Sequence, residues 1–165
     1  KIFIPEKRPR REILEEYLLA LGFQSGRWDL LRKRNLTSLV KTYRFARLLE
    51  TLKDYLKRYK KFESSRLAKM WGSELVETFN KFYLLDLGEL IEDEEKFQQE
   101  FYKALRHLEK IDLVEKLGEI SDKIKILEKQ KEISPQEQKK LEILNEEFRD
   151  LSAKLVSFEK NGQKS

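Results

Sequence analysis

The apolar residues in the last third of the chain recur at alternating steps of four and three positions. In the first of two such stretches they are Leu113, Leu117, Ile120, Ile124 and Leu127. In the second they are Leu141, Leu144, Phe148, Leu151, Leu155 and Phe158. This spacing is that of a heptad seam, in which each helix turns one apolar stripe toward its neighbour. The pattern therefore predicts two paired helices.

A signal for the start of a helix separates the two stretches. The hydroxyl of Ser134 can accept from the backbone N–H of Glu137, and the Glu137 carboxylate can accept from the N–H of Ser134. Pro135 stands where its missing N–H costs nothing. This capping box predicts an antiparallel hairpin over residues 112–160. Its arms of about 19 to 24 residues, roughly 28 to 36 Å, are expected to protrude from a compact bundle.

The preceding residues predict a helical bundle over residues 11–111. Residues 11–21 place apolar side chains on one face and are followed by Gly22, which favours a helix that ends there. Residues 36–59 keep a helical period for about six turns and predict the longest helix of the bundle. Its core stripe is expected to comprise Leu39, Tyr43, Ala46, Leu49, Leu52, Leu56 and Tyr59.

The connection between bundle and hairpin has two interpretations. Ser73 is expected to cap one helix of the bundle, and Asp93 is expected to cap the helix that leads toward the hairpin. No glycine or proline interrupts the chain between Asp93 and Gly118. Either one helix of about forty residues joins the two parts, or the chain kinks near residues 111–112, where the apolar stripe changes phase.

Composition limits the fold to the all-α class. The chain is 39% hydrophobic and 39% charged, and its six glycines and three prolines leave the body almost free of helix breakers. Two prolines fall in residues 1–10, for which we predict an extended linker that enters from an upstream part of a larger protein. Residues 161–165 are expected to form a disordered tail.

The absence of cysteine excludes disulfides and thiolate metal sites and fits a reducing, cytoplasmic compartment. No run of about 18 apolar residues occurs, so no membrane span is expected. Charge is divided along the chain. Residues 1–72 hold 19 Lys and Arg against 8 Asp and Glu, a net of +11, whereas residues 73–165 hold 16 against 22, a net of −6. A basic half favours a polyanion or an acidic partner.

Candidate catalytic chemistry is sparse. His107 is the only histidine, and general acid–base catalysis needs a positioned partner and a pocket, so we interpret it as a surface or boundary residue. Four consecutive acidic residues, 92–95, can attract a divalent cation, but at a helix start such residues usually complement the helix dipole. No phosphate-binding glycine loop or nucleophile motif occurs. We expect a non-catalytic chain without a metal or cofactor.

Basic residues between 53 and 61 offer a candidate nucleic-acid contact. They are Lys53, Lys57, Arg58, Lys60 and Lys61. Aromatic residues lie among them, and such a mixture can hold phosphates and stack on bases. The interpretation that we favour is that the aromatic residues face the core and the cations form a solvated outer face, because Leu56 and Tyr59 continue the core stripe.

Apolar residues of the hairpin that fall outside its seam are candidates for binding a partner, since the seam residues are used in pairing the two helices. Off the seam lie Val114, Ile126, Ile143 and Val156, with Ile133 at the tip. We add Phe158, at the end of the second arm, to this candidate set. These side chains can meet either a partner or the bundle.

The order of these parts resembles a known family. A proline- and arginine-containing start leads into a stretch that includes Leu-Glu-Glu-Tyr-Leu-Leu-Ala-Leu, at residues 14–21. A helical bundle, the segment 93–108 and a charged heptad hairpin follow. Over residues 10–158 the chain resembles the C-terminal helicase-binding domain of bacterial DNA primases. In that family the domain follows a zinc-binding domain and an RNA polymerase domain of the Toprim type, and this chain has neither.

The resemblance implies a bundle that stimulates the hexameric replicative helicase and a hairpin that binds the helicase N-terminal domains, whose fold is similar. The full-length protein would be a DNA primase, which is a DNA-directed RNA polymerase. Two alternatives remain open: a stand-alone basic module that binds nucleic acid, and a chain that dimerises weakly through its heptad seam.

Overall fold

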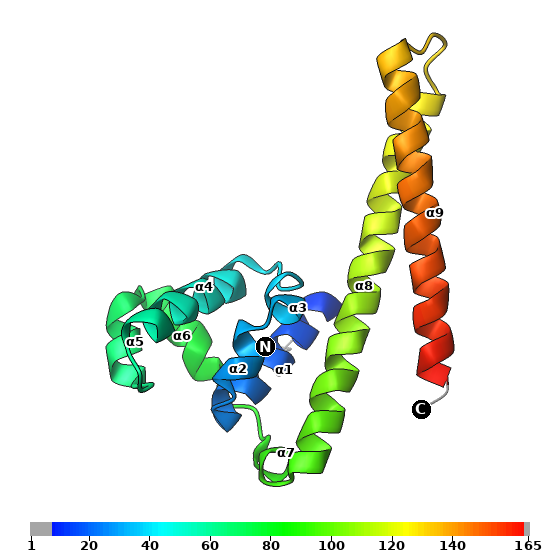
Figure 1. Ribbon diagram of the computed structural model, residues 1–165. Coiled ribbons are helices and arrows are strands. Elements are labelled where there is room, and N and C mark those ends of the chain that lie inside the picture. The colour runs from blue at the N-terminus through cyan, green and yellow to red at the C-terminus, as the bar shows by residue number, and fades with distance from the viewer. Residues whose placement is uncertain (1–7, 164–165) are drawn as a thin grey trace, which may run out of the picture. The chain divides into compact units, whose positions relative to one another are not determined.

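A computed structural model of the chain describes residues 8–163 and contains helices without strands in this range. This confirms the all-α class. The helices are α1 (Arg10–Ser25), α2 (Trp28–Arg32), α3 (Arg34–Thr37), α4 (Tyr43–Arg58), α5 (Ser64–Met70), α6 (Ser73–Phe82), α7 (Gly88–Glu92), α8 (Glu94–Glu128) and α9 (Pro135–Gln163) (Figure 1).

The chain divides into two compact units, Lys1–Leu108 and Glu109–Ser165, here called unit 1 and unit 2. The sequence placed the boundary between residues 111 and 112. Of the two interpretations of this region, the uninterrupted helix is the one observed, because α8 runs for 35 residues and the division falls within it.

Unit 1 has a large apolar core that is rich in aromatic rings. Its fully buried large side chains include Phe45, Tyr55, Phe82, Phe97 and Phe101. Helices α1, α2, α4 and α6 supply most of the packing around them, and α8 adds Phe97 and Phe101. The core therefore joins residues that are far apart in the sequence.

The first helix does not end at Gly22, as the sequence predicted, but continues to Ser25. Gly26 adopts a φ of 70° and ends the helix. The N–H of Gly26 donates a hydrogen bond to the Phe23 carbonyl, and the N–H of Arg27 donates one to the Gly22 carbonyl. This pair of bonds is a Schellman cap. Gly22 has a packing role instead: a Cβ at this position would lie 2.6 Å from Cγ of Leu31.

The predicted helix over residues 36–59 is also wrong, because the chain breaks between α3 and α4. The buried carboxylate of Glu15 accepts from the backbone N–H groups of Lys41 and Thr42, the second at 3.0 Å, and from the Thr42 hydroxyl at 2.8 Å. These bonds satisfy the N–H groups of the two residues that precede α4, so the chain can start a new helix there. Leu39 and Val40 still reach the core, which explains why the apolar period continues across the break.

The core face of α4 differs from the expected stripe at its first turn and again at Leu48 and Tyr55, which are buried although the stripe did not include them. Tyr43 is 77% exposed, whereas Phe45 is buried. Along the rest of the helix the buried positions are Leu48, Leu49, Leu52 and Tyr55. Leu56 and Tyr59 are partly buried and pack against this core.

Two predicted caps have different outcomes. Asp93 caps α8 as expected, because its Oδ1 accepts from the N–H of Lys96 at 3.2 Å. Ser73 is already inside α6, and the cap position belongs to Gly72, whose carbonyl accepts from the N–H of Val76. The second prediction is therefore wrong by one residue.

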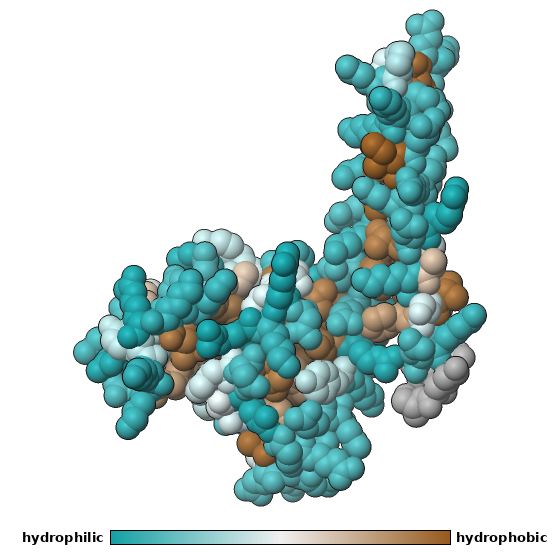
Figure 2. All heavy atoms as spheres, viewed as in Figure 1, coloured by the Kyte–Doolittle hydropathy of each residue, from teal (hydrophilic) through white to brown (hydrophobic). Residues whose placement is uncertain are grey.

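In unit 2 the last part of α8 and all of α9 form an antiparallel pair. Lys110 forms an ion pair with Glu159 at 3.4 Å, so the start of the α8 arm lies beside the end of α9. A small apolar cluster of Ile120, Leu127 and Leu144 is buried between the arms. Figure 2 shows patches of apolar residues along a mostly hydrophilic hairpin.

The turn of the hairpin has the expected cap in a modified form. The Ser134 hydroxyl accepts from the N–H of Glu137 at 3.2 Å, as predicted. The same hydroxyl donates to the Glu137 carboxylate at 3.1 Å, where the sequence predicted the backbone N–H of Ser134 as donor. At the other end, α9 continues to Gln163, so residues 161–163 of the predicted tail are helical. Residues 164–165, and residues 1–7 of the predicted linker, lie outside the described part.

Candidate functional site

The hairpin exposes the four aliphatic side chains that the sequence placed off its seam. The exposed fractions are 52% for Val114, 63% for Ile126, 57% for Ile143 and 52% for Val156. The other two candidates, Ile133 and Phe158, are half-buried. Unit 2 therefore presents exposed apolar surface alongside a narrow core.

The positions of these four residues match in two pairs along the arms of the hairpin. The Lys110–Glu159 ion pair sets the register of the arms, so position 114 is level with 156 and position 126 with 143. Val114 and Val156 each follow a seam residue by one position, whereas Ile126 and Ile143 each precede one.

At about 100° of rotation per residue, these opposite offsets place the two pairs on opposite faces of an antiparallel hairpin. We call them the valine patch (Val114 and Val156) and the isoleucine patch (Ile126 and Ile143). The isoleucine patch lies nearer the turn.

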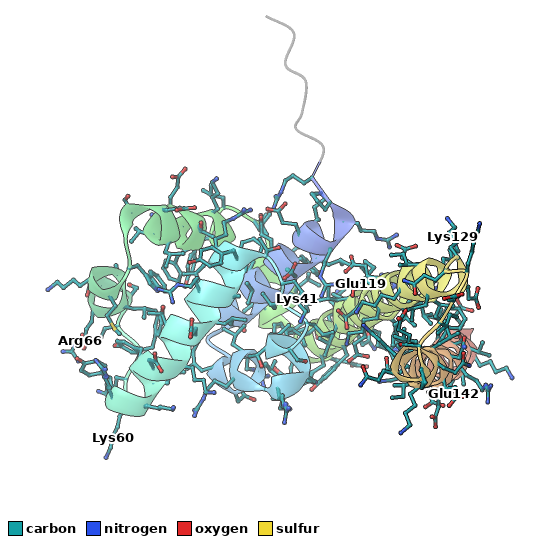
Figure 3. All side chains as sticks on the ribbon, turned by 90° about the horizontal axis from the view of Figure 1, so that it is seen from above. Lys41, Lys60, Arg66, Glu119, Lys129 and Glu142 are labelled. Carbon is teal, nitrogen blue, oxygen red and sulfur yellow. The ribbon has the colours of Figure 1, made fainter. Side chains whose placement is uncertain are left out.

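In unit 1 the five basic candidates are exposed and lie at the end of α4 and in the segment that follows. They are Lys53, Lys57, Arg58, Lys60 and Lys61, here called the lysine cluster. Among residues 8–163, none of the five has an ion-pair partner. Figure 3 shows Lys60 and Arg66 at the same end of unit 1, with both side chains directed outward.

The aromatic residues beside the lysine cluster face inward, as the favoured interpretation expected. Tyr55 is fully buried. Phe62 is stacked on Trp28 with ring centroids 4.2 Å apart, and Tyr59 is half-buried with the guanidinium of Arg66 lying 4.7 Å from its ring centroid. The packed rings therefore hold in place the segment that carries the exposed basic side chains.

Next to this surface is a hollow of about 600 Å³. It is lined by Phe62, Glu63, Ser64, Ser65, Phe79 and Tyr83, and we call it the aromatic hollow. Sequence reasoning did not find it, because its rings come from two segments about twenty positions apart and share no periodicity.

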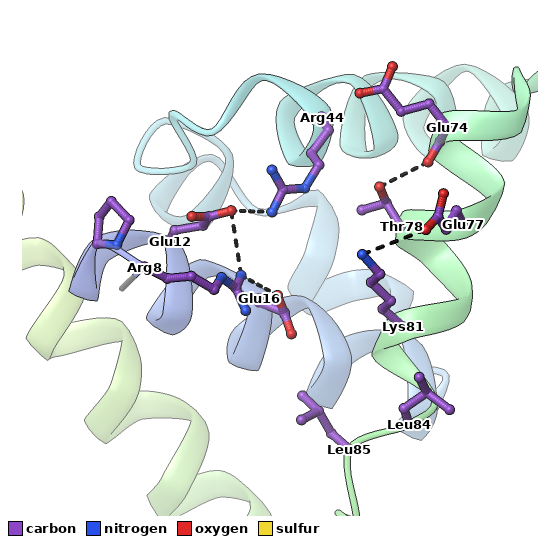
Figure 4. Close-up of a pocket in the computed structure, with 11 residues that line it drawn as sticks. Arg8, Glu12, Glu16, Arg44, Glu74, Glu77, Thr78, Lys81, Leu84 and Leu85 are labelled. Atoms are coloured by element: carbon purple, nitrogen blue, oxygen red, sulfur yellow. Dashed lines mark hydrogen bonds and ion pairs between the residues drawn. The ribbon is translucent and has the colours of Figure 1, made fainter. Parts of the chain in front are cut away.

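A second hollow, of about 710 Å³, lies between α1 and α6 (Figure 4). Arg8 forms ion pairs with Glu12 and Glu16, and Arg44 pairs with Glu12. The spacing of residues 8, 12 and 16 would have indicated neighbouring turns of one helix, but Arg44 reaches Glu12 only through the fold.

These contacts set the pKa of Glu12. Its partial burial alone would raise the pKa of this carboxyl, but the hydrogen bond from Arg44 and the charges of Arg44 and Arg8 lower it overall. On the other wall, Glu77 lies 3.8 Å from Lys81. The charges of this hollow are thus largely paired with one another, which gives it a role in joining α1 to α4.

The remaining candidates from the sequence are His107 and the acidic residues 92–95. His107 is exposed on α8, and Glu94 pairs with Arg27. Within the described range, no three His, Cys, Asp or Glu side chains gather in a way that could hold a metal ion. In the same range, none of the helices combines the length and apolar character needed to cross a bilayer.

Comparison of the chain with protein-family models, with curated proteins and with solved structures finds no match.

Proposed function

We propose that this chain is a non-catalytic interaction domain of a bacterial DNA primase that binds and stimulates the hexameric replicative helicase during primer synthesis. The resemblance of residues 10–158 to the helicase-binding domain of primases supports this proposal. The observation that carries it is the pair of apolar patches on the hairpin. A helical pair that uses its seam internally and still exposes paired aliphatic residues suits binding to other helices.

The magnitude of the contact can be bounded from the exposed fractions. Full burial of an aliphatic side chain contributes about 1.5 to 3 kcal/mol. The members of both patches are between 52% and 63% exposed. Covering one patch therefore contributes about 1.5 to 3.5 kcal/mol. One patch alone gives weak binding, so a specific complex must also use polar contacts around it.

The direct test is binding of the chain to the purified hexameric helicase by calorimetry, using one double variant for each patch. These are Val114→Asp with Val156→Asp, and Ile126→Asp with Ile143→Asp. Because each variant puts two carboxylates into an apolar contact, we expect at least one of them to weaken binding more than about tenfold. The same variant should abolish stimulation of DNA unwinding.

A matched control adds the same charge to the hairpin outside both patches. Gln138→Asp with Asn145→Asp serves this purpose, since both side chains are exposed. Retention of binding in the control and loss in a patch variant would support the proposal. Absence of saturable binding by the unmodified chain would refute it, and equal loss in the control would assign the effect to charge alone.

The oligomeric state distinguishes helicase binding from the remaining alternative, dimerisation through the heptad seam. We expect a monomer or a weak dimer, because the hairpin closes its seam within one chain. Dimerisation through the seam would give a mass near twice 19.9 kDa in light scattering. A stable dimer that persists in both patch variants would favour seam exchange over helicase binding.

A further inference from the structure

The surface of unit 1 where α4 ends and α5 begins indicates a second kind of partner. We propose that the lysine cluster and the aromatic hollow together bind single-stranded nucleic acid, with phosphates on the cations and one base in the hollow. Every residue involved lies in unit 1. This binding is therefore separable from a helicase contact on the hairpin.

The backbone that carries the cations is held in place from inside the core. The Tyr55 hydroxyl donates to the carbonyl of Lys61 and accepts from the N–H of Glu63, both at 3.0 Å. Phe62, between these two residues, is stacked on Trp28. A surface fixed in this way loses little backbone entropy when a ligand binds, which favours affinity.

The cations are arranged to follow a strand of phosphates. Lys53 and Lys57 lie one helical turn, about 6 Å, apart. The chain leaves the helix at Tyr59 and bends at Lys60 and Lys61, so the cluster covers at most roughly 15 Å. The phosphate charges of one stacked strand repeat about every 3.4 Å, so about four phosphates fit beside the cluster. Arg66, which lies over the Tyr59 ring, extends the basic surface onto α5.

The aromatic hollow distinguishes nucleic acid from an acidic peptide. It holds the rings of Phe62, Phe79 and Tyr83 and the hydroxyls of Ser64 and Ser65. Glu63 also lines it, and its carboxylate forms an ion pair with Arg66 at 3.5 Å. Bases stack on aromatic rings, and hydroxyls can bond base edges. An acidic peptide can pair with the lysines but has no planar group that requires the hollow. The combination of exposed cations and ring-lined space therefore favours a single strand with unpaired bases.

Binding of a labelled oligothymidylate of about 20 nucleotides, followed by fluorescence anisotropy, tests this proposal. Four phosphate contacts on a single strand predict that affinity falls about 50-fold between about 50 and 200 mM salt. Lys60→Glu with Lys61→Glu should weaken binding and reduce that fall to about sevenfold, because two contacts are lost. The control, Lys139→Glu with Lys140→Glu, makes the same charge change on exposed residues of α9.

The hollow is tested separately. Tyr83→Ala should weaken binding by about 5- to 150-fold while leaving the salt dependence unchanged, because a stacking contact is not ionic. Tyr83→Phe keeps the ring and should bind like the unmodified chain. The Tyr83 hydroxyl donates to the Phe23 carbonyl. Because Tyr83→Phe removes this hydrogen bond and keeps the ring, it shows whether loss of the bond alone weakens binding.

Several outcomes would overturn the proposal. The first is absence of saturable binding at about 50 mM salt. Equal loss in the Lys139 and Lys140 control would assign binding to net charge. A polyglutamate peptide that competes better than the oligonucleotide, together with full binding by Tyr83→Ala, would assign the surface to an acidic protein.

Discussion

Replacement of Glu15 by alanine should destabilise unit 1 more than any surface substitution. Its buried carboxylate accepts two backbone N–H groups and the Thr42 hydroxyl, which together connect α1 to the start of α4. A hydrogen bond to a charged group contributes about 1.5 to 3 kcal/mol, but bonds that share one acceptor group are not additive. Water can also replace the bond at exposed Lys41. The carboxylate also forms a buried ion pair with Arg11, whose Nε lies 3.9 Å away. We therefore expect a loss of about 3 kcal/mol, the lower end for a broken buried ion pair.

Urea unfolding followed by tryptophan fluorescence measures this loss in unit 1, because both tryptophans, Trp28 and Trp71, lie there. With a slope of about 1.5 kcal/mol per molar urea, the midpoint should fall by about 2 M. Glu15→Gln keeps the shape and one acceptor oxygen, so its loss should be smaller, about 1 to 2 kcal/mol.

The control is Glu77→Ala, which removes an exposed carboxylate 3.8 Å from Lys81 and should cost at most about 0.5 kcal/mol. If Glu15→Ala unfolds at the same urea concentration as the control with an unchanged slope, the carboxylate does not hold α4.

Three further predictions concern packing and pH. Gly22→Ala should destabilise unit 1 by about 1 to 3 kcal/mol, because its Cβ would overlap Leu31; an unchanged fluorescence midpoint in urea would contradict this. Gly118→Ala has nothing within 4 Å and should stabilise α8 by about 0.5 to 1 kcal/mol in unfolding followed by circular dichroism; destabilisation would show that the position is crowded. The lowered pKa of Glu12 means that its ionised form contributes stability above the ordinary value of 4.5, which is lost as pH falls through the lowered pKa. Unfolding in urea between about pH 3 and 6 should show this loss, and Arg44→Gln should make it shallower; equal pH dependence would refute the ion pair as its cause.

Sequence patterns predicted correctly those features that depend on contacts between residues close together in the sequence. The Ser134 turn and the Asp93 cap depend on residues within a few positions of one another, and both are present. The apolar stripe of each arm is also a local pattern, and the arms bury Ile120, Leu127 and Leu144 between them, but Phe148 of the predicted seam is 38% exposed. The exposure of the four off-seam aliphatic residues also follows from this level, because a helical pair has one inner face. The arms of unit 2 could thus be predicted without knowledge of the rest of the chain.

Contacts between distant segments account for the errors. Gly22 resembled a helix end, but it accommodates Leu31 from the next helix, and the real end is Gly26. The break before α4 depends on a carboxylate 26 positions earlier in the chain, which no helical period reveals. The aromatic hollow was missed for the same reason, since Phe62 and Tyr83 meet only after the core has formed.

The two units differ in what stabilises them, and this difference affects how a partner would act. Unit 1 has an extensive core, whereas the hairpin buries one cluster of three apolar residues between its arms. Long helices with little tertiary packing are only marginally stable in water. A helicase that covers one apolar patch adds burial where the chain has least, and at about 100 times its dissociation constant it stabilises the bound form by about 2.7 kcal/mol. Binding should therefore raise the midpoint of helix loss in circular dichroism more than the midpoint of tryptophan fluorescence. The reverse order would place the contact on unit 1.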